Sequence, residues 1–457
     1  MGGGESMNHP EITPKPAPIQ GEPIPGDETG EFAPALPEER LAHIDFIRGA
    51  ALFGVLAMNL QYFFRGPYEL FVWSGHTHPG FLNDCVDDLL SLLVEGKAMT
   101  LFSMLFAVGL SIQMERKLAR GGSFWGFALR RIGALFAIGA AHIVLIWNGD
   151  ILTMYALMAL PLFAFLKRRT RTLHIWLGTL LGLAGVAGAI FGFVRLSSPQ
   201  NGERRAQALA DASAMAQKLL EGYGQTGWWD ILVFRLQDYL EHLGMMAGGL
   251  VLVLLNFLVG LAVWRSGILQ NPAANLPRIR RAALWLSGLG LATGGVNLFI
   301  RPLAEYARSH GPWAKLLALP LSLSQIYHMP LLGLGFGALL LLLWQSGRAR
   351  SLLDAVAAAG RMALTQYLLQ SLVMTAVFYG WGLGLYGKIG SAAGLGIAAS
   401  FYAIQVASSA WWLRRYRFGP AEWLWRCAGY ARLQPFRLGS PSPVPGSPPV
   451  PEPARKG

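Results

Sequence analysis

Long apolar runs, each about as long as a bilayer-spanning helix needs to be, follow one another along most of this chain. Short loops separate them, and Lys and Arg are concentrated in every second loop. Basic residues in short loops mark the cytoplasmic side of a membrane, so this alternation places both chain termini in the cytoplasm. The pattern predicts an all-α, polytopic integral membrane protein with about ten transmembrane helices. The predicted spans are 40–64, 98–114, 132–146, 151–166, 173–194, 243–264, 282–300, 316–344, 362–381 and 391–413.

The composition favours a membrane protein over a soluble one. Hydrophobic residues make up 53% of the chain and charged residues 14%, whereas soluble domains contain about 25% charged residues. The net charge of +12 would suggest a nucleic acid partner for a soluble protein, but here the basic residues lie in short loops between apolar runs. We therefore expect membrane lipids and no nucleic acid as partners, and a multi-pass position in the inner (plasma) membrane. The two cysteines are too few and too far apart to indicate a metal site, and a homo-oligomer is left open.

The same patterns divide the chain into five segments. Residues 1–39 are rich in Pro, Gly and Glu, and we expect them to be disordered. Five spans form an N-terminal transmembrane bundle over 40–194, and the remaining spans form a C-terminal bundle over 242–430. Between them, residues 195–241 have mixed charge and hydrophobicity, which suits an extracytoplasmic loop with short interfacial helices. The Pro-rich segment 431–457 is predicted to be a disordered tail.

The first span carries three polar residues inside an apolar run. Asp45 precedes Arg48 by one helical turn, which allows an ion pair that offsets part of the cost of placing either charge near lipid. At 100° per residue, Asn59 returns to within roughly 20° of the face of Arg48, about 16 Å farther along. The two charged residues could instead only anchor the helix at the headgroups. Asn59 is harder to explain in this way, because an amide in hydrocarbon needs a partner or a water-filled cavity.

The segment HIVLIWNGD, residues 142–150, joins the third and fourth predicted spans at their extracytoplasmic ends. His142 lies within the membrane near this turn and could act as a general base oriented by Asp150, with Trp147 beside it as a candidate for binding substrate. The alternatives are that Asp150 caps the fourth helix and that His142 is a packed, satisfied core residue. The two interpretations do not exclude each other.

Three arginines near the cytoplasmic ends of spans could hold an anion such as phosphate or pyrophosphate. They are Arg48, Arg361 and Arg426, and the alternative for all three is ordinary contact with lipid headgroups.

Further polar residues could contribute to substrate binding together with Asp45. Lys97 begins a row continued by Thr100 and Ser103, although Ser and Thr in such helices usually bond back to their own backbone. His328 lies beside a proline that would kink its helix, where a hydrogen bond to a freed carbonyl is the commoner arrangement.

Five ordered blocks of the sequence resemble the YeiB-like family of bacterial multi-spanning membrane proteins, whose C-terminal half is a domain of unknown function. The blocks are IDFIRGAALFGVLAMN, EGKAMTLFSMLFAVGL, HIVLIWNGDIL, GRMALTQYLLQSLVMTAVFYGWGLGL and FGPAEWLWR, and together they span about residues 40 to 430. The resemblance covers most of the chain, so we expect the whole membrane region to share the fold of that family.

The opening Asp-x-x-Arg-Gly block is also similar to the transmembrane acyltransferase superfamily, which includes heparan-alpha-glucosaminide N-acetyltransferase and sugar O-acetyltransferases. Those enzymes take an acyl group from cytoplasmic acyl-CoA and deliver it to an acceptor on the far side of the membrane. By position, Asn59 matches their membrane-embedded Asn. Their catalytic His has no counterpart at the same spacing, because His76 and His78 lie farther along, and we take His142 in its place.

This resemblance implies an acyltransferase that uses acyl-CoA as co-substrate and a hydroxyl or amine of a small molecule, glycan or lipid as acceptor. In it, the three arginines would hold the CoA phosphates, Asn59 would polarise the thioester, and His142 with Asp150 would deprotonate the acceptor. The alternative is a transporter or flippase for a small or amphiphilic solute, in which the same residues bind without bond-making.

Overall fold

A computed structural model describes residues 41–65, 80–119, 124–197, 202–224, 227–298 and 319–438, and its regular structure there is helical apart from one isolated bridge between Tyr416 and Arg437. The chain is therefore all-α, as predicted. The 14 helices of the described ranges are α1 (Ala42–Arg65), α3 (Phe81–Leu93), α4 (Lys97–Ala119), α5 (Trp125–Leu145), α6 (Leu152–Leu166), α7 (Thr170–Ser197), α8 (Gly202–Gly224), α9 (Trp228–Arg265), α10 (Leu276–Leu298), α13 (Leu319–Gln345), α14 (Arg350–Arg361), α15 (Ala363–Phe378), α16 (Ser391–Trp412) and α17 (Pro420–Tyr430).

Seven of these helical stretches are long and apolar enough to cross a bilayer, so the chain is a polytopic membrane protein. They are Ala42–Phe63, Phe81–Ala119, Trp125–Leu145, Thr170–Val194, Gly248–Arg265, Ile326–Gln345 and Ser391–Trp412. The other three predicted spans also fall on helices, but α6 and α15 have only 15 and 16 residues, and α10 begins with a basic turn. The predicted tail 1–39 lies outside the described residues, as does the end of the other tail, 439–457.

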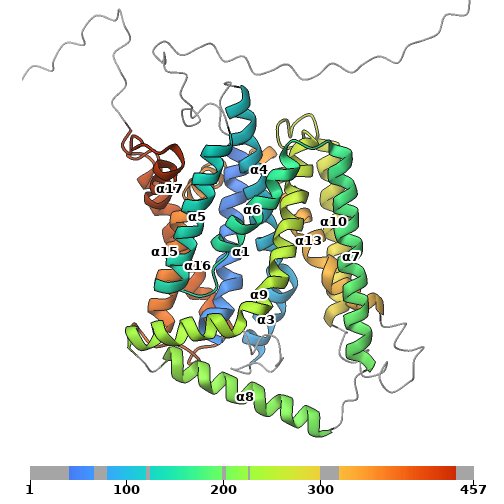
Figure 1. Cartoon of the computed structure of the whole chain (residues 1–457), viewed down its shortest axis with the longest axis vertical. Helices are drawn as coiled ribbons and strands as arrows, with labels where there is room; N and C mark the ends of the chain where they lie inside the picture. Colours follow the sequence, from blue (N-terminus) through green and yellow to red (C-terminus); the bar gives the residue numbers. More distant parts are fainter. Residues whose placement is uncertain are drawn as a thin grey trace, which may run out of the picture.

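The long helices lie side by side in a bundle, with α8 across one end and α17 at the other (Figure 1). In the bundle, α1 packs against α4 and α13 and also against α14, α15 and α16. The first helix of the chain is therefore surrounded by helices from both halves of the sequence. Its residues Leu52, Leu56, Ala57 and Leu60 have no exposed surface.

The region 195–241, predicted as a loop with short helices, contains α8 and the first part of α9. The 38-residue α9 continues without interruption into the span that begins at Gly248. As Figure 1 shows, α8 and the start of α9 lie across the same end of the bundle. This end of the bundle is therefore built by regular helices.

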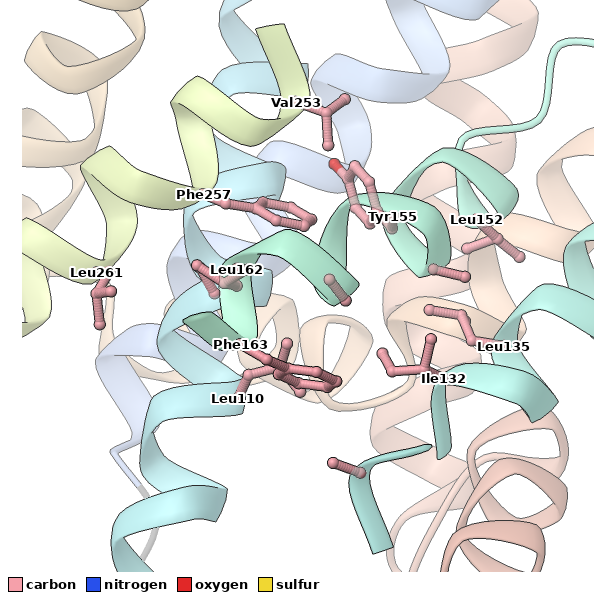
Figure 2. Packing of buried hydrophobic residues seen from close by; sticks show 14 of the residues in the cluster. Leu110, Ile132, Leu135, Leu152, Tyr155, Leu162, Phe163, Val253, Phe257 and Leu261 are labelled. Carbon is pink, nitrogen blue, oxygen red and sulfur yellow. The ribbon is translucent and has the colours of Figure 1, made fainter. Parts of the chain in front are cut away.

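A cluster of buried hydrophobic residues surrounds the short helix α6. Its Tyr155 and Leu162 meet Phe257 of α9, and Phe163 faces the start of α5 (Figure 2). The hydroxyl of Tyr155 shares a hydrogen bond of 2.8 Å with Ser103 of α4. At about 1.5 Å per residue, 15 residues cover only about 22 Å of a hydrocarbon core of about 30 Å. Contacts with α4, α5 and α9 therefore hold α6 in place where its length alone would not.

Candidate functional site

One cavity of about 480 Å³ runs beside α1 and is the centre of the candidate site. Its wall includes Arg48 and Tyr62, which are 14 residues apart on α1, or about 21 Å along the helix axis. We call its two ends the arginine end, formed by Arg48, Arg131, Arg361 and Arg426, and the histidine end, formed by Asn148, Asp150, Asp238 and His242.

Two glycines bring Arg48 and Arg361 together. A Cβ atom on Gly49 would overlap the carbonyl oxygen of Val356, and one on Gly360 would overlap that of Asp45. The backbones of α1 and α14 therefore touch where they cross, as helices do only at small residues. Because each glycine is next to an arginine in the sequence, this crossing places Arg48 and Arg361 on the same part of the cavity wall.

The two arginines differ in how strongly they are already paired. Arg48 donates to Asp45 at 2.7 Å, which confirms the predicted ion pair one turn apart. Arg361 is largely buried, and this burial lowers the pKa of its guanidinium, an effect that Asp45 opposes and Arg426 increases. The Nε of Arg361 is buried and makes no hydrogen bond within the described ranges. Arg361 therefore keeps donor capacity for a ligand.

Arg131 of α5 also lines the arginine end, although it was not among the arginines selected from the sequence. Only 5% of its surface is exposed, its guanidinium carbon lies 3.5 Å from the ring centre of Trp425, and its Nε lacks a partner among the described residues. A smaller cavity of about 140 Å³ shares Arg131 and Arg426 with the main one and adds Arg116 of α4. Positive charge thus surrounds a buried space between α4, α5 and α17.

Glu422 fixes α17, and with it Arg426, at the start of α15. One carboxylate oxygen accepts from the backbone N–H groups of Leu364 at 2.6 Å and Thr365 at 3.1 Å, and the other accepts from the Thr365 hydroxyl at 2.5 Å. Burial raises the pKa of Glu422, and these hydrogen bonds oppose the shift. The Glu422 carboxylate thus accepts hydrogen bonds from the free N–H groups at the start of α15, as an N-cap side chain would, although Glu422 lies 57 positions after Thr365 in the sequence.

Asn59 lies between the two ends. It is 8% exposed, lines the cavity, and makes no side-chain hydrogen bond to any described residue. An amide is costly to bury without a partner, so Asn59 can bond water or a ligand in the cavity. The neighbouring wall includes Trp147, whose ring packs 4.3 Å from that of Phe63.

His142 and Asp150 meet, but His142 does not line the cavity. Its Nδ1 lies 3.1 Å from Asp150 Oδ1, and both side chains are fully buried. The other oxygen of Asp150 accepts from the backbone N–H of Thr153 at 2.7 Å and from its hydroxyl at 2.9 Å. Asp150 therefore caps the start of α6 and contacts His142 at the same time, so both interpretations of this residue describe real contacts.

Sequence reasoning missed a second histidine and carboxylate, on α9. Asp238 Oδ2 accepts from the Tyr223 hydroxyl at 2.8 Å and from the Asn148 amide at 2.6 Å, and Oδ1 lies 3.1 Å from Nδ1 of His242. Tyr223 belongs to α8, Asp238 and His242 belong to α9, and Asn148 lies in the turn between α5 and α6. An acidic residue four positions before a histidine is a recognisable helical pair, but it was hidden by the prediction of a loop.

Three predicted binding residues do not belong to the cavity wall. Lys97 donates to the Ser91 carbonyl at 2.7 Å, and His328 bonds the Ser324 carbonyl at 3.0 Å beside Pro330, the commoner arrangement noted above. Asp45 is held by Arg48 and is absent from the lining. In the row that begins at Lys97, Thr100 and Ser103 bond back to backbone carbonyls, and His76 and His78 lie outside the described residues.

Comparison with known proteins identifies the family. Residues 263–432 match the model of a family described as "Protein of unknown function (DUF418)". The chain is 33% identical over 421 residues to the uncharacterized protein YxaH of Bacillus subtilis (strain 168), covering 88% of this chain and 97% of that protein. The chain belongs to the DUF418 family.

Other relatives of this chain match it over similar lengths. The chain is 29% identical over 392 residues to the uncharacterized protein YeiB of Escherichia coli (strain K12), which covers 85% of this chain and 96% of YeiB. It is also 27% identical over 407 residues to an uncharacterized 39.9 kDa protein of Bacillus acidopullulyticus, covering 88% and 97% of the two chains. The YeiB-like resemblance is therefore confirmed. No solved structure matches the chain.

The segment that matches the DUF418 model supplies only part of the cavity. Its contribution includes Arg361, Tyr367, Tyr379, Glu422 and Arg426, whereas α1, α4, α5, the turn after α5, α6, α8 and the start of α9 contribute the rest of the wall. Both halves of this DUF418 protein are needed to form the site.

Proposed function

We propose that this DUF418 protein is a membrane-embedded acyltransferase that moves an acyl group from cytoplasmic acyl-CoA to an extracytoplasmic hydroxyl or amine. The observation that carries the proposal is the single cavity in which an arginine-rich end and an end with carboxylates and histidine are joined past Asn59. A thioester bound at one end would have a lined path toward an acceptor bound at the other.

The arginine end suits the phosphate groups of CoA. Guanidinium groups bind phosphate through paired, charge-assisted hydrogen bonds, and the buried Nε atoms of Arg131 and Arg361 are open to a new partner within the described part of the chain. In the proposed topology of about ten spans with cytoplasmic termini, the starts of α1 and α15 lie on the cytoplasmic side. A soluble donor could then reach the arginines from the cytoplasm.

Asn59 is placed to stabilise the reacting carbonyl. Acyl transfer passes through a tetrahedral oxyanion, and an N–H donor aimed at that oxygen lowers the barrier. The Asn59 amide faces the cavity without a protein partner among the described residues, so its N–H groups are free for this role. Its position about 16 Å along α1 from Arg48 is consistent with a long donor whose phosphates and thioester are well separated.

Transport of an amphiphilic solute is the second candidate, favoured by a cavity that extends along α1 and is lined mostly by apolar side chains with polar groups among them. The two functions differ in one chemical event, because only a transferase breaks the thioester bond.

The test is binding and cleavage of acetyl-CoA by purified protein in lipid nanodiscs, with ethanolamine supplied as the hydroxyl and amine acceptor, for the wild type and for Asn59→Ala. The proposal predicts saturable binding with release of free CoA, and retained binding with lost CoA release in the variant. Binding without CoA release in the wild type would favour transport, and absence of binding with acyl chains of several lengths would refute the acyltransferase.

A further inference from the structure

We infer that His242, oriented by Asp238, is the general base that deprotonates the acceptor at the histidine end of the cavity. The inference rests on the proposed function and deepens it, because it assigns the proton acceptor to a residue of α9 in place of His142. The evidence is the hydrogen bonds of His242, its place in the cavity wall and the carboxylates that line the histidine end.

The contacts of His242 fix its tautomer. Its Nδ1 lies 2.7 Å from the backbone carbonyl oxygen of Asp238 and 3.1 Å from the carboxylate oxygen Oδ1 of the same residue. Both atoms can only accept hydrogen bonds, so Nδ1 must carry the proton in the neutral ring. The Nε2 atom is then the unprotonated nitrogen, which is the form that a general base requires.

The position of His242 gives that nitrogen access to a substrate. The side chain is 15% exposed and lines the cavity, and Nε2 makes no hydrogen bond to the described residues. His242 also lies six residues before Gly248, where the membrane-spanning window of α9 begins. A base must come within hydrogen-bond reach of the proton it removes, and His242 meets this condition from the cavity wall.

His142 has a similar carboxylate contact but a different position. Its side chain has no exposed surface, and the rings of Trp147 and Tyr367, which do line the cavity, lie 6.3 Å and 5.2 Å from it. A substrate in the cavity would meet those rings before it met the imidazole. The buried pair therefore holds the turn between α5 and α6, and the α9 pair faces the substrate.

Asp238 is rigidly held, as a residue that orients a base must be. It is 2% exposed and accepts hydrogen bonds from Tyr223 and Asn148 in addition to its contact with His242. One turn earlier on α9, Arg235 donates to the carbonyl oxygens of Val144, at 2.8 Å, and Ile146 at the end of α5. These bonds fix the start of α9 against the turn that carries Asp150.

The same surroundings indicate the acceptor class. The carboxylates of Asp150 and Asp238 line this end of the cavity, and the four arginines Arg48, Arg131, Arg361 and Arg426 lie at the other end. The nearby guanidinium of Arg235 bonds the Val144 and Ile146 carbonyls and is absent from the wall. Negative charge disfavours an anionic acceptor here. The acceptor is therefore a neutral or cationic molecule that carries a hydroxyl or amine group.

The reaction consumes only the acceptor and the acyl-CoA. The acceptor oxygen or nitrogen attacks the thioester carbonyl carbon while Nε2 of His242 takes the proton of that O–H or N–H group. The tetrahedral intermediate collapses, the carbon–sulfur bond breaks, and the proton passes to the CoA thiolate. The products are the ester or amide and free CoA.

The experiment measures acetyl-CoA binding and CoA release in nanodiscs, with ethanolamine as the acceptor probe because it offers both a hydroxyl and an amine. The variants are His242→Gln, Asp238→Asn and His142→Gln. The matched control is His43→Gln, a buried histidine that bonds the Leu269 carbonyl at 2.8 Å and is absent from the cavity wall.

We expect His242→Gln to lose at least about 100-fold in CoA release with unchanged acetyl-CoA binding, since general base catalysis contributes about 10²- to 10⁴-fold. Imidazole added to His242→Ala should restore part of the turnover, which a structural role would not explain. His43→Gln should match the wild type. Wild-type turnover in His242→Gln, or a loss confined to His142→Gln, would overturn the assignment to His242 and leave the acyltransferase intact. A wild type that neither binds nor cleaves acetyl-CoA would overturn the proposed function and this inference together.

A second measurement does not depend on the folding of a variant. Diethyl pyrocarbonate modifies accessible imidazoles, so wild-type protein should lose CoA release in proportion to the modification of His242, and hydroxylamine should restore it. Complete modification of His242 with full turnover would overturn the inference.

Discussion

The two ends of the cavity are built in different ways. The arginine end depends on close backbone contact between α1 and α14 and on one carboxylate, Glu422, that ties α17 to α15. The histidine end depends on side-chain hydrogen bonds centred on Asp238, which join α8, α9 and the turn after α5. Glycines that allow two backbones to touch thus shape the arginine end, and a network of side-chain hydrogen bonds shapes the histidine end.

The difference teaches how each end tolerates change. A helix crossing at glycine fails when any side chain is added, because the obstacle is a backbone carbonyl that has little room to move. A hydrogen-bond network fails when one partner is lost and another buried group is left unsatisfied.

Gly360→Leu should have the largest effect, because its side chain would have to displace the Asp45 carbonyl and separate α1 from α14. We expect a loss of about 3 kcal/mol of stability together with loss of acetyl-CoA binding. Thermal unfolding followed by tryptophan fluorescence, and binding in nanodiscs, measure the two effects.

The control is Gly133→Ala, an exposed glycine of α5 whose added Cβ meets nothing within 4 Å. Removing glycine from a helix should stabilise it by about 1 kcal/mol. Equal behaviour of the two variants would show that the α1–α14 contact is unimportant.

Asn59→Ala should lower CoA release by about 100- to 1000-fold, the usual cost of removing one oxyanion donor. Binding of acetyl-CoA and thermal stability should change little, because Asn59 has no hydrogen bond to lose within the described protein. Single-turnover kinetics with labelled acetyl-CoA separate the two steps. Unaltered turnover would remove Asn59 from the site.

Arg131→Met should weaken acetyl-CoA binding by roughly tenfold or more, since a hydrogen bond to a charged group contributes about 1.5–3 kcal/mol. Methionine keeps an unbranched apolar chain beside Trp425 and removes the charged guanidinium. Isothermal titration is the measurement, and Arg278→Met, an exposed arginine of α10, is the control. Equal affinity of the two variants would exclude Arg131 from the phosphate site.

Lys218→Ala should have the smallest effect. Its ammonium group contacts Glu241 at 2.8 Å, but both side chains are exposed and such pairs contribute little. We expect no measurable change in melting temperature or turnover. A clear loss of turnover would show that the surface contact between α8 and α9 positions His242.

The sequence allowed the helical spans and much of the arginine end to be predicted, because each signal was local. Apolar runs mark spans, and Arg48 and Arg361 stand next to the glycines that bring them together. The pairing of His142 with Asp150 was also predictable, since a short turn must return the chain to the same side.

The part of the histidine end that lies on α9 was missed for a physical reason. Asp238 and His242 lie in a segment whose charge and hydrophobicity are mixed, and it folds as a helix because α9 continues through it into the membrane. Lys97 and His328 lie outside the cavity wall for a local reason. Helical spacing selected Lys97 and the neighbouring proline selected His328, but backbone carbonyls only six and four residues away bond their polar groups.

The position of α1 also has a consequence for synthesis. Its closest contact, with α14, joins residues roughly 300 positions apart, and at about 5–20 residues per second a ribosome needs about 15–60 s to make that intervening chain. During this interval Arg48 has no α14 beside it, whereas Asp45 is available from the start because it lies one turn away on the same helix. The ion pair between Asp45 and Arg48 therefore lowers the net charge that α1 presents to lipid until α14 has been synthesised.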